Sequence, residues 1–204
     1  MHTTLKIAAF SCLALALAAC GSAKDANEGN FENAIQAYLD TQKGLCVEVP
    51  TRKLPFTLEN SDKPNRQNKQ ADALVEAGLL VKHAADVKPR SWSKMKSASE
   101  YQVTDLGKKY LVTGESTGFF AEAGFCTGKY TVVGIDNFTE PSDILGAKMS
   151  QVNFRYKVKE PADWANSESL QSAYGEFAKK IKNDTPDKAV LVLTNEGWMH
   201  KALL

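Results

Sequence analysis

Three residues of this chain occur in the types and order that nucleophilic catalysis by a serine requires. Gly114-Glu115-Ser116-Thr117-Gly118 fits the pattern Gly-x-Ser-x-Gly, and Asp187 and His200 follow it in the order in which hydrolases place their acid and base. That chemistry also needs a sharp strand-to-helix turn under the serine and an oxyanion loop upstream. No alternation of strands and helices surrounds Ser116, because a helical segment ends near Leu111. We therefore expect Ser116 to lie in a linker, with an envelope hydrolase as the alternative.

The N-terminal segment has the form of a secretion signal. Lys6 precedes an apolar run from Ile7 to Ala19, about thirteen residues dominated by Ala and Leu. A membrane-spanning helix needs roughly 20 apolar residues, so this run is too short to cross a bilayer. The segment predicts export to an oxidising compartment.

The residues that close this run resemble a known processing site. Leu17-Ala18-Ala19-Cys20 is similar to the bacterial lipobox, in which small residues precede a cysteine that is alkylated by diacylglycerol. The resemblance implies that residues 1–19 are removed and that Cys20 becomes a lipid-anchored N-terminus. Gly21, where Asp would favour the inner membrane, implies delivery to the outer membrane, facing the periplasm. An ordinary cleaved signal peptide is the alternative.

Cys46 and Cys126 are the two cysteines left for pairing, because Cys12 is removed with residues 1–19 and Cys20 is modified by lipid. Two thiols in an exported protein most often pair, and this pair would stabilise the fold by roughly 4 kcal/mol in the chain-entropy model. Free buried thiols, or a metal site with His83 and His200, are the alternatives. The spacings Cys-x-x-Cys and His-x-x-x-His are both missing, so we expect a disulfide, no metal and no cofactor.

The net charge of the mature chain argues against a nucleic-acid partner. The chain has 25 basic and 24 acidic residues, and removal of residues 1–19 takes away one lysine and no acid, so the mature charge is near zero. A nucleic-acid-binding domain normally has a clear basic excess. We expect no nucleic-acid partner, and we expect the lipid on Cys20 to be the only membrane anchor.

The first part of the mature chain carries helix and strand signals in succession. Residues 20–30 are small and polar, which predicts a flexible tether. Apolar residues then recur at helical spacing from Phe31 to Leu39, and Leu45, Val47 and Val49 predict a short strand with Cys46 on its opposite face.

A longer succession follows from Asn68. It comprises a helix that ends at Gly78, a strand from Leu79, a basic stretch with Trp92, a returning strand and a helix capped by Thr104. This order resembles the helix, wing and closing helix of winged-helix domains, although no clean extra helix precedes it. On such a wing, basic residues contact DNA phosphates. Export and the neutral charge favour a solvated loop or a protein-docking surface instead.

The last part of the chain predicts a small antiparallel sheet with a packed helix. Residues 152–159 alternate between apolar and polar side chains, as in a strand with one solvent-exposed face. An apolar stripe from Leu170 to Ile181 predicts one helix that begins at Ser167, and Ala189–Leu193 is apolar throughout, as a central strand is.

Together these observations predict an α+β protein. We expect a signal peptide (1–19), a tether (20–30), a winged-helix-like part (31–115) and a β-rich part (116–204). The expected role is non-enzymatic docking or accessory work with an envelope protein or the cell wall. An envelope hydrolase using Ser116 and a carrier of lipids or small molecules are the alternatives.

Overall fold

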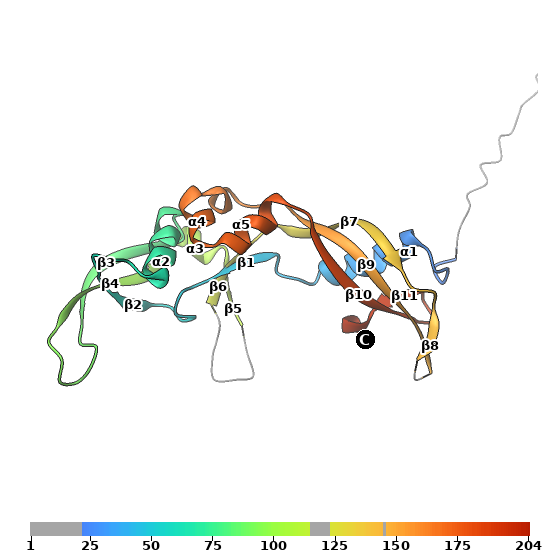
Figure 1. Ribbon diagram of the computed structural model, residues 1–204, viewed down its shortest axis with the longest axis horizontal. Coiled ribbons are helices and arrows are strands. Elements are labelled where there is room, and N and C mark those ends of the chain that lie inside the picture. The colour runs from blue at the N-terminus through green and yellow to red at the C-terminus, as the bar shows by residue number, and fades with distance from the viewer. Residues whose placement is uncertain (1–21, 115–122, 145) are drawn as a thin grey trace, which may run out of the picture.

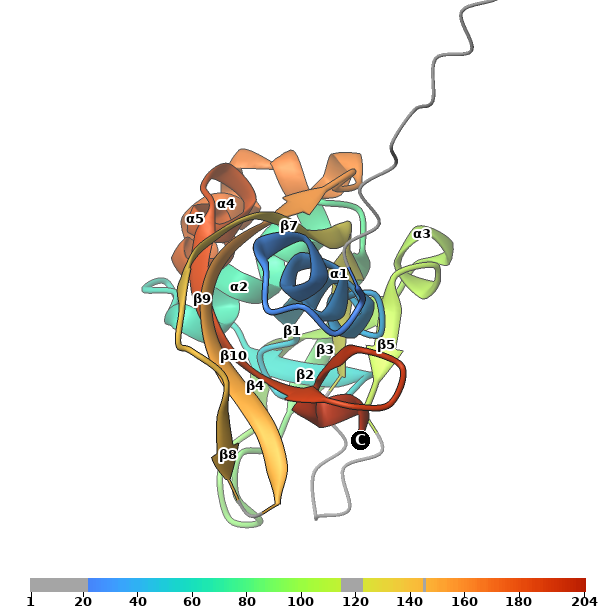
Figure 2. The ribbon, with the colours of Figure 1, turned by 90° about the vertical axis from the view of Figure 1, so that its right-hand side faces the viewer.

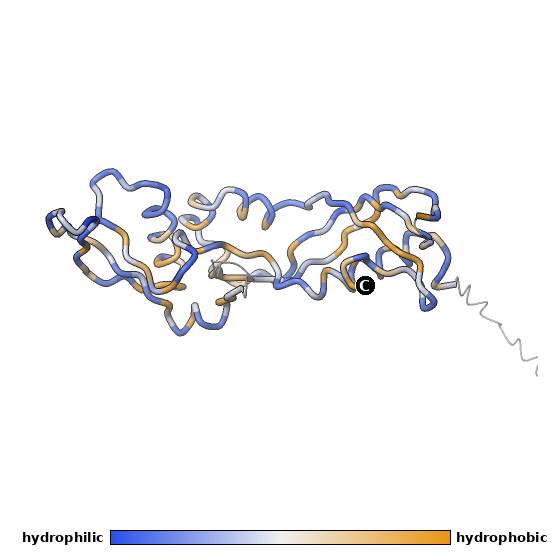
Figure 3. Tube along the Cα trace, turned by 90° about the horizontal axis from the view of Figure 1, so that it is seen from below, coloured by the Kyte–Doolittle hydropathy of each residue, from blue (hydrophilic) through white to orange (hydrophobic). Residues whose placement is uncertain are grey.

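The computed structural model describes residues 22–114, 123–144 and 146–204. Within these ranges the molecule is elongated and has two hydrophobic cores, one toward each end (Figure 1). Apolar stretches accordingly occur in both halves of the trace (Figure 3). Cys20 and Ser116 lie outside the described residues. No helix within the described ranges is long and apolar enough to cross a membrane.

The described part combines helices with antiparallel sheets, which confirms the mixed fold class. Its α-helices are α1 (Glu28–Leu39), α2 (Arg66–Glu76), α3 (Asp105–Lys108), α4 (Glu168–Ala173) and α5 (Gly175–Lys182), with 3-10 turns η1 (Asp163–Asn166) and η2 (Lys201–Leu203). Its strands are β1 (Leu45–Glu48), β2 (Phe56–Glu59), β3 (Leu80–Val87), β4 (Lys96–Val103), β5 (Leu111–Thr113), β6 (Ala123–Thr127), β7 (Lys129–Phe138), β8 (Ser142–Ile144), β9 (Ala147–Lys159), β10 (Thr185–Leu193) and β11 (Trp198–His200).

One core forms where a curved sheet wraps around helix α1. The strand order is β11-β10-β9-β7, and β8 pairs with the start of β9. Two register shifts, at Val132/Gly134 and at Ile135/Asn137, interrupt the pairing of β7 with β9, and such bulges bend a sheet. The sheet therefore curls into a half-barrel, and α1 occupies its concave face (Figure 2).

The strands of this sheet follow the predicted patterns. Along β9 the buried residues are Ser150, Val152, Phe154 and Tyr156, and more exposed residues alternate with them. Strand β10 lies between β9 and β11, which explains why Ala189–Leu193 is apolar throughout. The alternation in β9 and the central position of β10 are both confirmed.

Helix α1 begins within the stretch expected to be a tether. Asn27 caps the helix by accepting a hydrogen bond from the N–H of Asn30 at 2.9 Å. The indole N–H of Trp198 reaches back to the carbonyls of Lys24 at 3.2 Å and Asp25 at 3.1 Å. These contacts hold the backbone before the helix against β11, and the sequence pattern could not show them because Trp198 lies near the other end of the chain.

The second core lies between helices α2, α4 and α5 and two three-stranded sheets, ordered β2-β4-β3 and β1-β6-β5. Helix α2 ends as predicted, because Gly78 takes a φ of +75° that favours glycine. The buried side chains that fill this core include Val47, Leu74, Tyr101, Phe125, Leu170 and Phe177.

The winged-helix arrangement is not shown by this core. Helix α2, the β3–β4 hairpin and the Thr104 cap occur in the expected order. The closing helix, however, is the single turn α3, and Leu111, expected at its end, begins strand β5. Helix α1 packs in the other core, so it does not supply the remaining helix.

The helix expected from Ser167 to Ile181 is two helices. Tyr174 leaves the helical conformation, with φ −126° and ψ 68°, and separates α4 from α5. Both helices belong to the core that contains α2, while the helix packed on the C-terminal sheet is α1. The chain thus crosses between the two cores, and they do not follow the boundary expected near residue 115.

Candidate functional site

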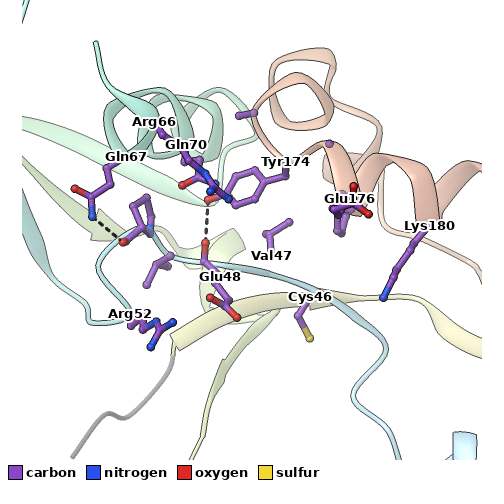
Figure 4. A pocket seen from close by; sticks show the side chains of 15 residues that line it. Cys46, Val47, Glu48, Arg52, Arg66, Gln67, Gln70, Tyr174, Glu176 and Lys180 are labelled. Carbon is purple, nitrogen blue, oxygen red and sulfur yellow. Dashed lines mark hydrogen bonds between the residues drawn. The ribbon is translucent and has the colours of Figure 1, made fainter.

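A groove of about 780 Å³ lies at the middle of the molecule, where elements from distant parts of the chain meet. Strand β1 and the residues after it form one side, helix α2 forms a second, and the junction of α4 and α5 forms the third (Figure 4). The side chains and backbone that line it come from residues 46–50, from Arg52, and from residues 66–70 and 173–180.

Strand β1 forms because its apolar residues alternate. Leu45 and Val47 are buried in the core, while Cys46 and Glu48 lie on the exposed face, as predicted. Cys46 stands directly opposite Cys126 of β6, and their Sγ atoms are 2.00 Å apart, the distance of a disulfide. The predicted pairing agrees with this geometry, and the bond ties β1 to its only strand neighbour within the described residues.

Two side chains of the helices hydrogen-bond to the backbone along β1. The hydroxyl of Tyr174 donates to the carbonyl of Glu48 at 2.9 Å, and the amide of Gln67 donates to the carbonyl of Pro50 at 3.1 Å (Figure 4). Burial raises the pKa of the Tyr174 hydroxyl well above its usual value, so it remains protonated and keeps its donor. Tyr174 lies at the break between α4 and α5, which brings its ring over the strand.

The groove carries more unpaired positive than negative charge. Arg66 and Lys180 make no ion pair with any residue that the structure describes. Of the two carboxylates in the lining, Glu176 is paired with Lys179 at 2.6 Å, and only Glu48 lacks a cationic partner among the described residues. The groove is thus suited to hold a ligand with negative charge, and its described lining has neither a histidine nor a cysteine thiol for catalysis.

A second candidate is the loop between β3 and β4, residues 88–95, which we call the hairpin tip. Trp92 is 79% exposed and Met95 is 60% exposed, although both are large apolar side chains. The Arg90 guanidinium lies 5.8 Å from the centre of the Trp92 ring, a cation–π arrangement. A turn orders the tip, because Ser93 N–H donates to the carbonyl of Arg90 at 2.9 Å.

The hairpin tip is basic as well as aromatic. Lys88, Arg90 and Lys94 are exposed, form no ion pair within the described part of the chain, and have no acidic neighbour between residues 88 and 95. The tip projects from one end of the molecule, and the start of α1 lies at the opposite end (Figure 1). The hairpin thus presents this surface far from the N-terminal end of the described chain.

The described structure contains two residues of the alternative serine triad, Asp187 on β10 and His200 on β11. Ser116 lies outside it. His200 is buried, its ring stacks on Tyr38 at 3.8 Å, and its Nδ1 accepts a hydrogen bond from the N–H of Ala202 at 3.2 Å. A triad histidine must instead donate from Nδ1 to its acid. His200 therefore has a packing role in this arrangement.

The metal alternative finds no support in the described ranges. His83 is exposed on β3 in one half of the molecule, and His200 is buried on β11 in the other. No group of three or more His, Cys, Asp or Glu side chains is close enough to hold a metal ion in the part of the chain that the structure describes.

Sequence reasoning missed the groove completely. Glu48 and Tyr174 are 126 residues apart, and neither belongs to a motif. The hairpin tip was visible as a basic stretch with a tryptophan, but its exposure and its position at one end of the molecule were not. Comparison with protein families, with curated proteins and with solved structures gave no match for this chain.

Proposed function

We propose that the chain is a lipid-anchored envelope protein whose work is docking, with the hairpin tip as its contact surface. Cys20 would fix one end to the outer membrane, facing the periplasm, as the lipobox resemblance implies. The partner would be a negatively charged component of the envelope, a protein or the cell wall, and the chain would carry out no catalysis itself.

The observation that carries this proposal is the exposure of Trp92 and Met95 among unpaired cations. Large apolar side chains that stay exposed to water do not give the isolated fold the stabilisation that their burial would provide. Trp, Met and Arg are the residues enriched at protein interfaces, and Trp and Arg most often carry the binding energy. Unpaired Lys88, Arg90 and Lys94 favour a partner of opposite charge and speed its association.

The position of the tip supports the same proposal. The N-terminal end of the described chain, which follows Cys20 closely, and the tip lie at opposite ends of an elongated molecule (Figure 1). A protein anchored at Cys20 would therefore hold the tip away from its own membrane.

The residues that the structure describes give no support to the two alternatives. The concave face of the curved sheet, where a carrier would hold its ligand, is filled by Phe31, Ile35 and Leu39 of helix α1. His200 does not have the hydrogen bonding that a triad requires.

Photocrosslinking tests the proposal in intact cells. A benzophenone amino acid replacing Trp92 is expected to capture a defined envelope partner, and one replacing Val133, which is 37% exposed on β7, is expected to capture none. With that partner purified, W92A is expected to weaken binding by about 2 kcal/mol, roughly 30-fold. Loss of all charge at Lys88, Arg90 and Lys94 should weaken binding strongly, while the same change at exposed Lys148, Lys157 and Lys159 should not. Equal capture at both positions would refute the tip as the contact surface.

The anchor has its own test. C20A is expected to release the protein from the membrane fraction and to alter its electrophoretic mobility, because one acylated residue would provide the whole attachment. Unchanged fractionation in C20A would refute the lipid anchor without bearing on the tip.

A further inference from the structure

Among the residues that the structure describes, strand β1 pairs with a neighbouring strand along one edge only, and its other edge faces the central groove. In the β1-β6-β5 sheet β1 is an outer strand, with β6 as its neighbour. The N–H of Val49 donates to the carbonyl of Ala123 at 3.0 Å, so the backbone of Val49 points toward β6. Backbone groups of an antiparallel strand alternate in direction, so Val47 also points toward β6, and Cys46 and Glu48 point away from it.

The far side of β6 confirms this alternation. The N–H of Cys126 donates to the carbonyl of Tyr110 at 2.9 Å, away from its partner residue Cys46. Cys46 and Cys126 are thus a pair without mutual backbone hydrogen bonds, and the backbone groups of Cys46 face the groove. In Figure 4, β1 accordingly runs between β6 on one side and the helices on the other.

The groove-facing edge offers a definite set of hydrogen-bonding groups. The amides of Cys46 and Glu48 donate to no residue that the structure describes, and the carbonyl of Cys46 accepts from no backbone or side-chain donor there. The carbonyls of Glu48 and Pro50 are occupied by the side chains of Tyr174 and Gln67. Backbone groups spaced along a strand are complementary to the backbone of another strand.

We infer that the groove binds an extended segment of a partner polypeptide, which adds to β1 as a fourth strand of the β1-β6-β5 sheet. Binding by strand addition draws its affinity from main-chain hydrogen bonds and its specificity from flanking side chains. The five lining residues Cys46–Pro50 give a run of about 17 Å at about 3.3 Å per residue, enough to pair with a segment of similar length.

The charges of the groove specify the segment further. Arg66 on α2 and Lys180 on α5 stand on opposite sides of Tyr174 above the strand (Figure 4). Because neither has an anionic partner in the described structure, the segment would carry acidic side chains that reach them. This site is separate from the hairpin tip, and the inference does not depend on the function proposed for the tip.

Tyr174 acts as a reversible cover of the strand edge. Its hydroxyl satisfies the Glu48 carbonyl while the groove is empty, and it must give up that hydrogen bond when an incoming N–H takes its place. Removal of the hydroxyl by Y174F would leave the carbonyl free, so it is expected to strengthen binding about threefold.

Peptide selection on the full chain tests the inference. Random peptides long enough to span Cys46–Pro50 are displayed, selected on the detergent-solubilised protein, and the enriched sequences are expected to contain Asp or Glu. E48P removes the groove-facing N–H without loss of a bond to β6 and is expected to weaken binding at least tenfold. Its matched control, E48A, removes the charge and keeps the N–H, so binding should change less than threefold.

Hydrogen exchange on the unaltered protein gives an independent measurement if E48P does not fold. A bound peptide is expected to slow exchange of the Cys46 and Glu48 amides at least tenfold and to leave the Val47 amide, which already faces β6, unchanged. Failure to select any peptide would overturn the inference. So would binding that E48P leaves intact, or binding that W92A abolishes and that protects neither amide.

Discussion

Replacement of Phe31 by alanine tests the packing of helix α1 in the curved sheet. The Phe31 side chain has no exposed surface, and its ring meets Phe138 at 4.8 Å and Trp198 at 4.9 Å, both edge to face. Phe→Ala in a core costs about 3–5 kcal/mol, and each aromatic pair adds about 0.5–1.5 kcal/mol beyond its buried area. The cost of the Phe→Ala change already includes part of the aromatic-pair energy, so we expect F31A to lower the free energy of unfolding by about 4 kcal/mol.

Urea unfolding followed by circular dichroism measures this loss, with the midpoint lowered and the slope unchanged. The control is E32A, because Glu32 is the exposed neighbour of Phe31 on the same helix, and its loss should stay within about 0.5 kcal/mol. A loss below about 1 kcal/mol in F31A would refute the packing, since it would mean that the Phe31 ring gains little from the sheet. It would leave α1 as a helix outside the core.

Three further predictions concern other parts of the fold. Replacing Cys46 and Cys126 together by serine is expected to lower the free energy of unfolding by roughly 4 kcal/mol, and the reduced native protein should show the same loss in a chemical denaturation series. Burial lowers the pKa of His200 below its usual 6.5, so below pH 6.5 the unfolded chain takes up a proton that the folded chain does not. Thermal melts of the native protein should therefore show that its stability decreases as the pH is lowered, and the decrease should be smaller in H200Q. A Cβ at Gly107 would clash with the backbone carbonyl oxygen of Leu79, so G107A should lower the free energy of unfolding by more than about 2 kcal/mol. G175A, with no atom within 4 Å of the new carbon, should leave it unchanged or raise it slightly, and equal effects of the two substitutions would contradict the close approach.

Local patterns predicted many elements of this fold correctly. The end of α2 at Gly78, the alternation of β9 and the apolar run of β10 depend on residues within a few positions of one another. Such patterns are visible because helices and strands repeat every 3.6 and 2 residues. The cysteine count likewise predicted a pair that the structure places at bonding distance.

The errors occurred where distant contacts override a local pattern. The apolar stripe from Leu170 to Ile181 predicts one helix, but the chain breaks at Tyr174 so that its ring lies over β1 and its hydroxyl reaches Glu48. Residues before Phe31 read as a tether, yet the Trp198 indole hydrogen-bonds to Lys24 and Asp25.

The two candidate sites likewise have some properties that follow from local sequence and others that depend on tertiary contacts. By itself the sequence determined that the hairpin tip is basic, holds Trp92 and lacks acidic residues, because those properties belong to one short segment. Only the tertiary structure decided that the tip stands at the end of the molecule away from α1, and that β1 presents an unpaired edge beneath Tyr174. The physical reason is that an open strand edge depends on which strands pair with β1 and on which helices flank it. These elements come from separate parts of the chain, and Tyr174 is 126 residues from Glu48, the residue whose carbonyl it covers.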